Sequence, residues 1–333
     1  MVGFLLQMRT SRIMTKARAQ LISLEATPYY HCVSRCVRRS FLCGYDSERN
    51  QCFEHRRGWI EERLLNLSQV FCIDVCAYAI MSNHYHVVLH INQEEMQSLS
   101  DQDVCERWLS FHTPPLLIQK WLKQESLTEA EAEKVHDLID TWRERLASIS
   151  WFMRMLNQYI ATQANKEDGC TGHFWEGRFK SQALLDEQAL AAAMTYVDLN
   201  PIRANMADSP ETSEYTSVKA RVDTLRENKA TAPCLHPFVG YPRTNQPTGI
   251  PFRLMDYLEL VDWTGRHIRD DKRGHIDHIL PPILSRLGIS KETWLHACTE
   301  LERGNVVGKE ESVKRALPTL KRKRVSGYRL PDS

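Results

Sequence analysis

Several structural signals are missing from this 333-residue chain. It has no run of about 18 uninterrupted apolar residues, so the sequence predicts no membrane-spanning helix. Its apolar start, MVGFLLQM, has no basic stretch before it and no small-residue cleavage site after it, so we expect a cytoplasmic protein without a signal peptide. Cys32 and Cys36, like Cys72 and Cys76, lack the Cys-x-x-Cys interval of zinc knuckles, and we expect reduced thiols.

The net charge of +1 averages segments of opposite sign. Residues 1–39 carry seven Lys or Arg against one acidic residue, a net charge of +6, and residues 309–333 carry eight against three, a net charge of +5. Residues 94–148 carry six against twelve, a net charge of −6. Basic ends suit a polyanionic partner, although a charged run is more often a solvated surface.

The strand and helix signals at the start of the chain follow the order strand, helix, strand, strand. The predicted elements are strand 28–38, helix 47–67, strand 70–81, strand 84–91, helix 149–166, strand 172–182 and helix 186–199. This order predicts an α+β fold, with an antiparallel sheet and helices on one face in a ferredoxin-like or RRM-like arrangement.

Other segments lie outside this pattern. Residues 94–148 predict an acidic helical insertion, in which Ser126-x-x-Glu129 has the form of a capping box. Residues 207–252 are rich in Pro, Thr, Ser and Asn and predict a linker, followed by a small helical unit at 253–308 and a basic tail at 309–333. The turn around Gly288 is loosely like that of a helix-turn-helix, but such turns are common in helical bundles.

The stretch MSNHYHVVLH places three histidines within seven residues of an apolar run. On a strand, His84 and His86 share a face with backbones about 6.6 Å apart, so both imidazoles could bind one ion. His90 lies about 13 Å beyond His86, and we expect it to be a bystander. A histidine pair is more often hydrogen-bonded or exposed than metal-bound, so the pair alone leaves both alternatives open.

A tyrosine and a glutamine lie one turn apart on the predicted helix WFMRMLNQYIATQANK. Tyr159 and Gln163 share a helical face. In one interpretation Tyr159 is a rim residue of the core with its hydroxyl in water. In the other, Tyr159 is a nucleophile and Gln163 is an oxygen-donating metal ligand.

Together these residues resemble the HUH single-strand DNA transposases, in particular the REP-associated tyrosine transposases of bacteria. The resemblance rests on His84-Tyr85-His86, Tyr159-x-x-x-Gln163, GHFWEGRFKS and YVDLNPIRA, and covers about residues 28–206. The segment from Met14 is also similar to a family amino terminus. We therefore expect an extension at 1–13 and a catalytic domain at 14–206, interrupted by the insertion, which departs from the family's minimal pattern.

The resemblance implies a nucleophile, a metal site and a substrate. His84, His86 and Gln163 would hold Mg²⁺ or Mn²⁺, and Tyr159 would attack the phosphorus of single-stranded or hairpin DNA, including repetitive extragenic (REP) elements. The product would be a 5′-phosphotyrosine with a free 3′-hydroxyl on the other DNA end. A later strand transfer needs no ATP, which fits the absence of Walker and Rossmann glycine patterns. The protein would act in the bacterial cytoplasm, at the nucleoid when bound to DNA.

Basic and aromatic side chains predict the DNA contacts. They are Arg35, Arg38, Arg39, Trp175, Arg178, Phe179, Lys180, Lys321, Arg322, Lys323 and Arg324. Core packing of the two aromatic residues and a solvated basic tail are the alternatives. We expect the acidic insertion to pack away from the site or to gate it, because its charge would repel DNA.

Two other functions remain open from the sequence. One is a domesticated nucleic-acid-binding protein that no longer cleaves, and the other is a relaxase-like or replication-initiator-like nickase. The recognised DNA sequence and the choice between monomer and homodimer are also left open.

Overall fold

A six-stranded sheet organises the chain in the computed structural model, which describes residues 22–37, 42–47, 50–229, 231–244, 246–268, 280–302, 304–320 and 326–330. The strand order is β4-β5-β1-β6-β7-β8. The strands are β1 (Tyr29–Arg35), β4 (Ile73–Ile80), β5 (His84–Ile91), β6 (Lys180–Leu184), β7 (Val306–Lys309) and β8 (Gly327–Leu330). A separate short pair, β2 (Tyr45–Asp46) and β3 (Gln51–Cys52), precedes the first helix.

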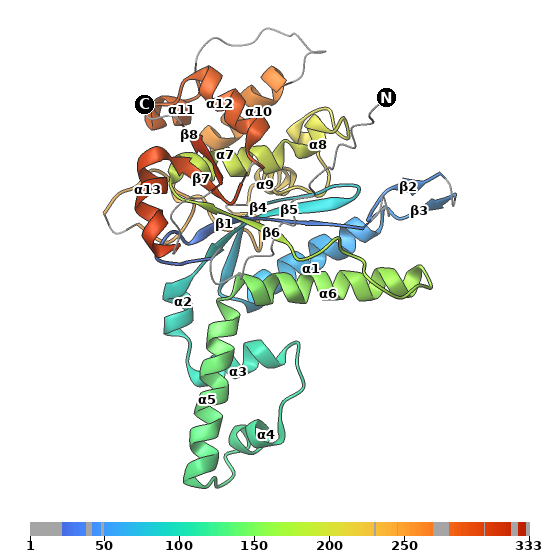
Figure 1. Ribbon diagram of the computed structural model, residues 1–333, viewed down its shortest axis with the longest axis vertical. Coiled ribbons are helices and arrows are strands. Elements are labelled where there is room, and N and C mark those ends of the chain that lie inside the picture. Colours follow the sequence, from blue (N-terminus) through green and yellow to red (C-terminus); the bar gives the residue numbers. More distant parts are fainter. Residues whose placement is uncertain are drawn as a thin grey trace, which may run out of the picture.

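Helices cover both faces of this sheet (Figure 1). On one face lie α1 (Arg56–Val70) and α6 (Ile149–Glu167), and on the other lies α7 (Glu187–Asp198). The predicted α+β class is confirmed. Two details of the prediction are wrong, because helices cover two faces rather than one, and β7 joins β6 and β8 in parallel rather than antiparallel pairs.

Strand β5 is buried along both faces, which explains its nearly continuous apolar sequence. Tyr85, Val87 and Leu89 point into the core beneath α1 and α6. His86 and Val88 alternate with them and point toward α7. The alanine-rich sequence of α7 allows this close packing, since every residue from 188 to 198 in that helix is buried.

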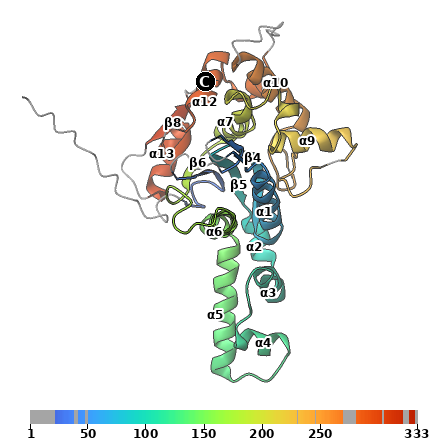
Figure 2. The ribbon, with the colours of Figure 1, turned by 90° about the vertical axis from the view of Figure 1, so that its right-hand side faces the viewer.

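The acidic insertion forms a helical arm that extends away from the sheet (Figures 1 and 2). Its helices are α2 (Gln93–Ser98), α3 (Asp101–Leu109), α4 (Leu116–Leu122) and α5 (Glu129–Leu146). The predicted capping box is two residues too early. Thr128 and Glu131 form the box, because the Thr128 hydroxyl accepts from the Glu131 backbone and the Glu131 carboxylate accepts from the Thr128 backbone.

The carboxy-terminal elements complete the same fold. They are α8 (Asn200–Arg203), η2 (Pro210–Thr212), α9 (Ser217–Arg226), α10 (Leu254–Ile268), α11 (Pro282–Leu287), α12 (Lys291–Glu300) and α13 (Glu310–Thr319). Segment 207–252, predicted as a linker, thus contains α9. Helices α10 and α12 share a hydrophobic core with α7, while β7 and β8 extend the sheet. The proposed domain boundaries stay a prediction.

Candidate active site

The two histidines of the motif lie on the sheet face that α7 covers. Their ring centroids are 4.8 Å apart, and His86 is fully buried. The side chain of His86 is joined to His31 of β1, because the two nitrogens, His31 Nε2 and His86 Nδ1, are 3.0 Å apart. His31 in turn lies 2.8 Å from the Gln182 amide oxygen of β6 through its Nδ1. Three neighbouring strands therefore contribute to one polar cluster.

The orientation of the Gln182 amide fixes the proton positions along this relay. Its nitrogen donates to the carbonyls of Leu301 and Gly304 at 2.8 and 2.9 Å, so its oxygen faces His31 Nδ1. His31 must then carry its hydrogen on Nδ1 and accept at Nε2 the hydrogen of His86 Nδ1. The relay therefore leaves a lone pair on His86 Nε2.

Burial keeps the histidines neutral. Desolvation lowers the pKa of His86 well below its ordinary value, and the nearby imidazoles and arginines lower it further. Burial, reinforced by Arg35, lowers the pKa of His84 to about 4. His86 Nε2 has no hydrogen-bond partner, and the carboxylate oxygen Glu302 Oε1 lies 3.6 Å from it. An unpartnered imidazole lone pair beside a carboxylate fits a bound cation.

A tyrosine that the sequence reasoning had not selected adjoins this pair. The ring of Tyr196, on α7, has its centroid 5.8 Å from that of His86. The Tyr196 hydroxyl donates to Glu302 Oε1 at 2.7 Å. The Arg203 guanidinium lies 4.1 Å from the centroid of the Tyr196 ring. Burial raises the pKa of Tyr196, so its hydroxyl needs a base to become a nucleophile.

Tyr159 and Gln163 do not join the histidines. They lie on α6, which packs on the opposite face of the sheet, where the Tyr85 hydroxyl donates to the amide oxygen of Asn157 of the same helix at 2.8 Å. The Tyr159 ring packs against the core on that side, and the Arg63 guanidinium lies 4.8 Å from its centroid. The predicted grouping of Tyr159 and Gln163 with the histidine pair is corrected, since the sheet separates them.

The predicted DNA contacts divide between the two faces. Arg35 is exposed and is the register partner of His84, and Lys180 pairs with Val33 on the same face. Arg178 is exposed just before β6.

The two aromatic residues of the set belong to the other face. Trp175 and Phe179 pack into the core beneath α6, and the Trp175 indole donates to the Asn157 carbonyl at 2.9 Å. The core-packing alternative therefore describes these two residues. The remaining predicted contacts, Arg38, Arg39, Lys321, Arg322, Lys323 and Arg324, lie outside the described residues.

The sequence offered one signal for the missed tyrosine. Tyr196 and Asn200 are four positions apart in YVDLNPIRA, the same spacing as Tyr159 and Gln163. Asn200 is buried, and its amide nitrogen has no hydrogen-bond partner. No local signal marks His31, Gln182 or Glu302, which reach the cluster only through strand pairing and a distant turn.

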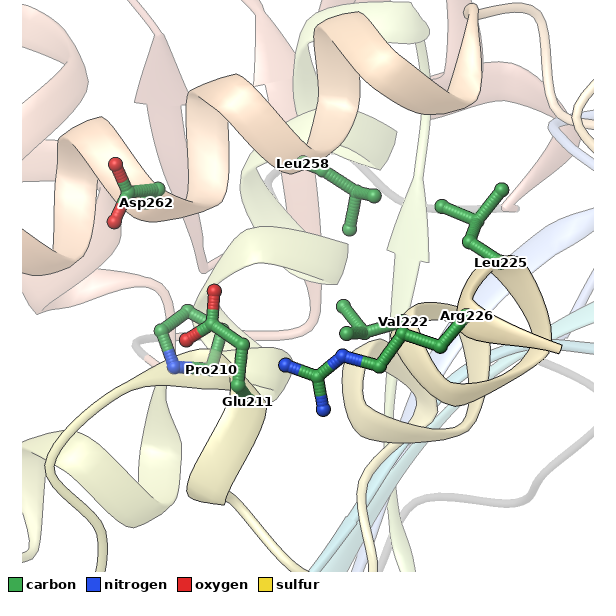
Figure 3. A pocket seen from close by; sticks show the side chains of 7 residues that line it. All are labelled: Pro210, Glu211, Val222, Leu225, Arg226, Leu258 and Asp262. Carbon is green, nitrogen blue, oxygen red and sulfur yellow. The ribbon is translucent and has the colours of Figure 1, made fainter.

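Two further features lie apart from the histidine pair. An open pocket of about 350 Å³ lies between η2, α9 and α10, lined by four apolar residues and by the charged residues Glu211, Arg226 and Asp262 (Figure 3). His90, predicted as a bystander, instead forms a group with Asp74 and His236 that could hold a metal ion.

Comparisons with known proteins give one structural likeness. No protein-family model and no curated protein sequence matches the chain. A solved structure, described as the REP-associated tyrosine transposase bound to a REP hairpin, is similar with a TM-score of 0.36 and 10% sequence identity. The match covers 72% of this chain and 99% of that one. At this TM-score we infer neither fold nor function from it.

Among the described residues, no helix has the length and apolar character that crossing a membrane requires.

Proposed function

We propose that the chain is a metal-dependent enzyme that cleaves and rejoins single-stranded or hairpin DNA, as the HUH transposases it resembles do. In this proposal Tyr196 is the nucleophile, Glu302 is its base, and His84 and His86 hold Mg²⁺ or Mn²⁺. REP elements are the substrate class that the sequence resemblance suggests. The role that the sequence indicated for Tyr159 passes to Tyr196.

One observation carries the proposal. A tyrosine hydroxyl and an unpartnered imidazole nitrogen converge on one carboxylate, since Glu302 Oε1 lies 2.7 Å from the Tyr196 hydroxyl and 3.6 Å from His86 Nε2. A nucleophile within hydrogen-bond reach of a base, beside a metal-ligating group, is the arrangement that covalent phosphoryl chemistry needs.

The cleavage step follows from these contacts. Tyr196 transfers its proton to Glu302 while its oxygen bonds to the phosphorus, and the bond from phosphorus to the 3′-oxygen breaks. The 3′-oxygen takes up a proton from water and leaves as a hydroxyl, and the 5′-phosphate stays on Tyr196. In the rejoining step a 3′-hydroxyl loses its proton to water and attacks this phosphotyrosine, and Glu302 returns its proton to the leaving Tyr196 oxygen. The strands are thus rejoined without an external energy source.

The metal ligands fit this chemistry. The relay from Gln182 through His31 orients His86 and leaves its Nε2 free to bind an ion, as outer-shell partners of metal-bound histidines do. Asn200 offers an amide oxygen one helical turn from Tyr196. A bound divalent ion would polarise the scissile phosphate and offset the charge that develops on its oxygens.

Basic groups around the histidines supply the substrate contacts. Arg35 and Lys180 lie on the histidine face, and Arg203 lies over the nucleophile. These cations would bind phosphates on either side of the scissile bond, so affinity should fall as salt concentration rises. Because Trp175 and Phe179 are in the core, base stacking on them is not part of the proposal.

Incubation with labelled hairpin DNA and Mn²⁺ tests the proposed function. A 3′-labelled strand should give a protein–DNA adduct that resists denaturation, because the 5′-phosphate side of the break stays on the protein. A 5′-labelled strand should give a shorter free product. Binding without any adduct would instead favour the non-cleaving alternative, and nicking without an adduct would exclude a tyrosine nucleophile.

A further inference from the structure

A second group of metal-ligating side chains lies at the far end of β5. Asp74 of β4 and His90 of β5 are partners in the strand register, and His236 joins them from the segment that follows α9. Asp74 Oδ2 lies 2.8 Å from His90 Nδ1 and 3.2 Å from His236 Nδ1. The three donor atoms lie within 4.8 Å of one another, so all can reach one point.

This group is separate from the proposed active site. His90 and His86 share a face of β5, but four residues of strand place their backbones about 13 Å apart. None of the hydrogen bonds of the relay through His31 reaches His90. An ion bound here would therefore not touch Tyr196.

The donor set favours zinc. Two imidazole nitrogens and one carboxylate oxygen are ligands that Zn²⁺ accepts, whereas Mg²⁺ prefers oxygen ligands and several waters. In a tetrahedral zinc site with bonds of about 2.0–2.1 Å, neighbouring donors lie about 3.3 Å apart. The observed 2.8 and 3.2 Å approach this spacing, so a small outward movement would admit the ion once the hydrogens that the two Nδ1 atoms donate to Asp74 have moved to Nε2.

Burial and charge also suit a cation. His90 and His236 are 7% and 4% exposed, and their rings stack with centroids 4.7 Å apart. Burial lowers the pKa of His236, which keeps this imidazole neutral at pH 7. Burial opposes ionisation of Asp74, but hydrogen bonds from His236 and His90 outweigh it and hold its pKa below the usual range. An ionised carboxylate thus faces two imidazole nitrogens, and the Asp74 side chain is partly exposed to solvent.

The position of the group indicates what a metal would do there. Strand β4 is an edge of the sheet, and the His236 backbone already donates to the Val75 carbonyl of that strand at 2.9 Å. The described residues between α9 and α10 form neither a helix nor a named strand. A link between sequence-distant residues would hold this segment over the sheet edge that β4 forms. We propose that Asp74, His90 and His236 bind one zinc ion that fastens residues 231–240 to β4.

Zinc content and hydrogen exchange test this proposal without any DNA. The full chain is stripped of metal and titrated with Zn²⁺. The same titration is made with a double variant that carries both His84→Ala and His86→Ala and so lacks the histidine ligands of the proposed active site. This double variant should still bind one zinc ion, and zinc should slow amide exchange in residues 231–240. Zinc should also raise its unfolding midpoint. Absence of tight binding in the double variant would overturn the proposal.

Single substitutions then assign the ligands. His236→Gln and Asp74→Asn, made in the double variant, should each weaken zinc binding at least 10-fold and abolish the protection of 231–240 by zinc. His136→Ala, at an exposed histidine of the insertion arm, is the matched control and should leave binding unchanged. If His236→Gln binds zinc as tightly as its parent, the assignment is wrong. Circular dichroism of the metal-free proteins identifies any variant that has failed to fold.

Discussion

The buried glutamine of the relay gives a test of the proposed metal site that leaves its ligands untouched. Gln182→Leu keeps the approximate volume but removes the acceptor for His31 Nδ1 and the donors to the carbonyls of Leu301 and Gly304. His31 can then adopt the other tautomer. His86 would no longer be required to leave its lone pair on Nε2, so the substitution should weaken metal binding without changing a ligand.

The size of the effect follows from the contacts. Loss of an outer-shell partner of a metal-bound histidine typically costs about 10–100-fold in metal affinity, or about 1.4–2.8 kcal/mol. Three hydrogen bonds at about 1 kcal/mol each predict a stability loss of about 3 kcal/mol. Calorimetric titration with Mn²⁺ measures the affinity, and denaturant unfolding measures the stability.

A matched control separates the two effects. Gln188→Leu also removes a buried glutamine, one whose amide donates to the Leu287 carbonyl at 2.7 Å and, among the described residues, forms no hydrogen bond with a histidine. This control should lose stability and keep its Mn²⁺ affinity. An unchanged Mn²⁺ affinity in Gln182→Leu would refute the relay.

Three further predictions concern other parts of the molecule. Burial raises the pKa of Asp198, so its own contribution to stability falls as pH rises above about 4; in urea unfolding, the stability of wild type relative to Asp198→Asn should therefore fall over that range. Arg203→Ala removes the cation over Tyr196 and should slow adduct formation on the order of 10²-fold in single-turnover assays, with Arg203→Lys closer to wild type. Trp142→Ala removes a buried side chain of the arm and should unfold the arm locally, which hydrogen exchange would detect as faster exchange in α5. It should not change DNA affinity at 0.15 M salt, because the arm extends away from the histidine face (Figure 2).

Local sequence pattern predicted the elements better than their assembly. Strand β5 begins and ends at His84 and Ile91 as predicted, because its run is nearly continuously apolar and a tight turn precedes it. Strands β7 and β8 were missed because each has four residues, and each contains a glycine that weakens the strand signal. The first helix begins at Arg56 rather than residue 47, since the β2–β3 pair occupies the intervening segment.

The candidate site shows the same limit. The histidine pair was visible because both members lie on one strand. The choice between Tyr159 and Tyr196 was not, because both precede a polar residue by four positions and both lie on helices that pack on the sheet. Which face each helix covers depends on how the chain crosses the sheet, and no local spacing records that. The relay depends on register, since Gln182 meets His31 through the pairing of β6 with β1.

The identity of the tyrosine bound to DNA tests the central proposal most directly. The adduct formed with hairpin DNA and Mn²⁺ is digested with protease and nuclease, and mass spectrometry identifies the peptide that carries the nucleotide. We predict that the nucleotide is on Tyr196, that Tyr196→Phe forms no adduct, and that Tyr159→Phe forms as much as wild type. A nucleotide on Tyr159, or an undiminished adduct from Tyr196→Phe, would contradict the proposed active site.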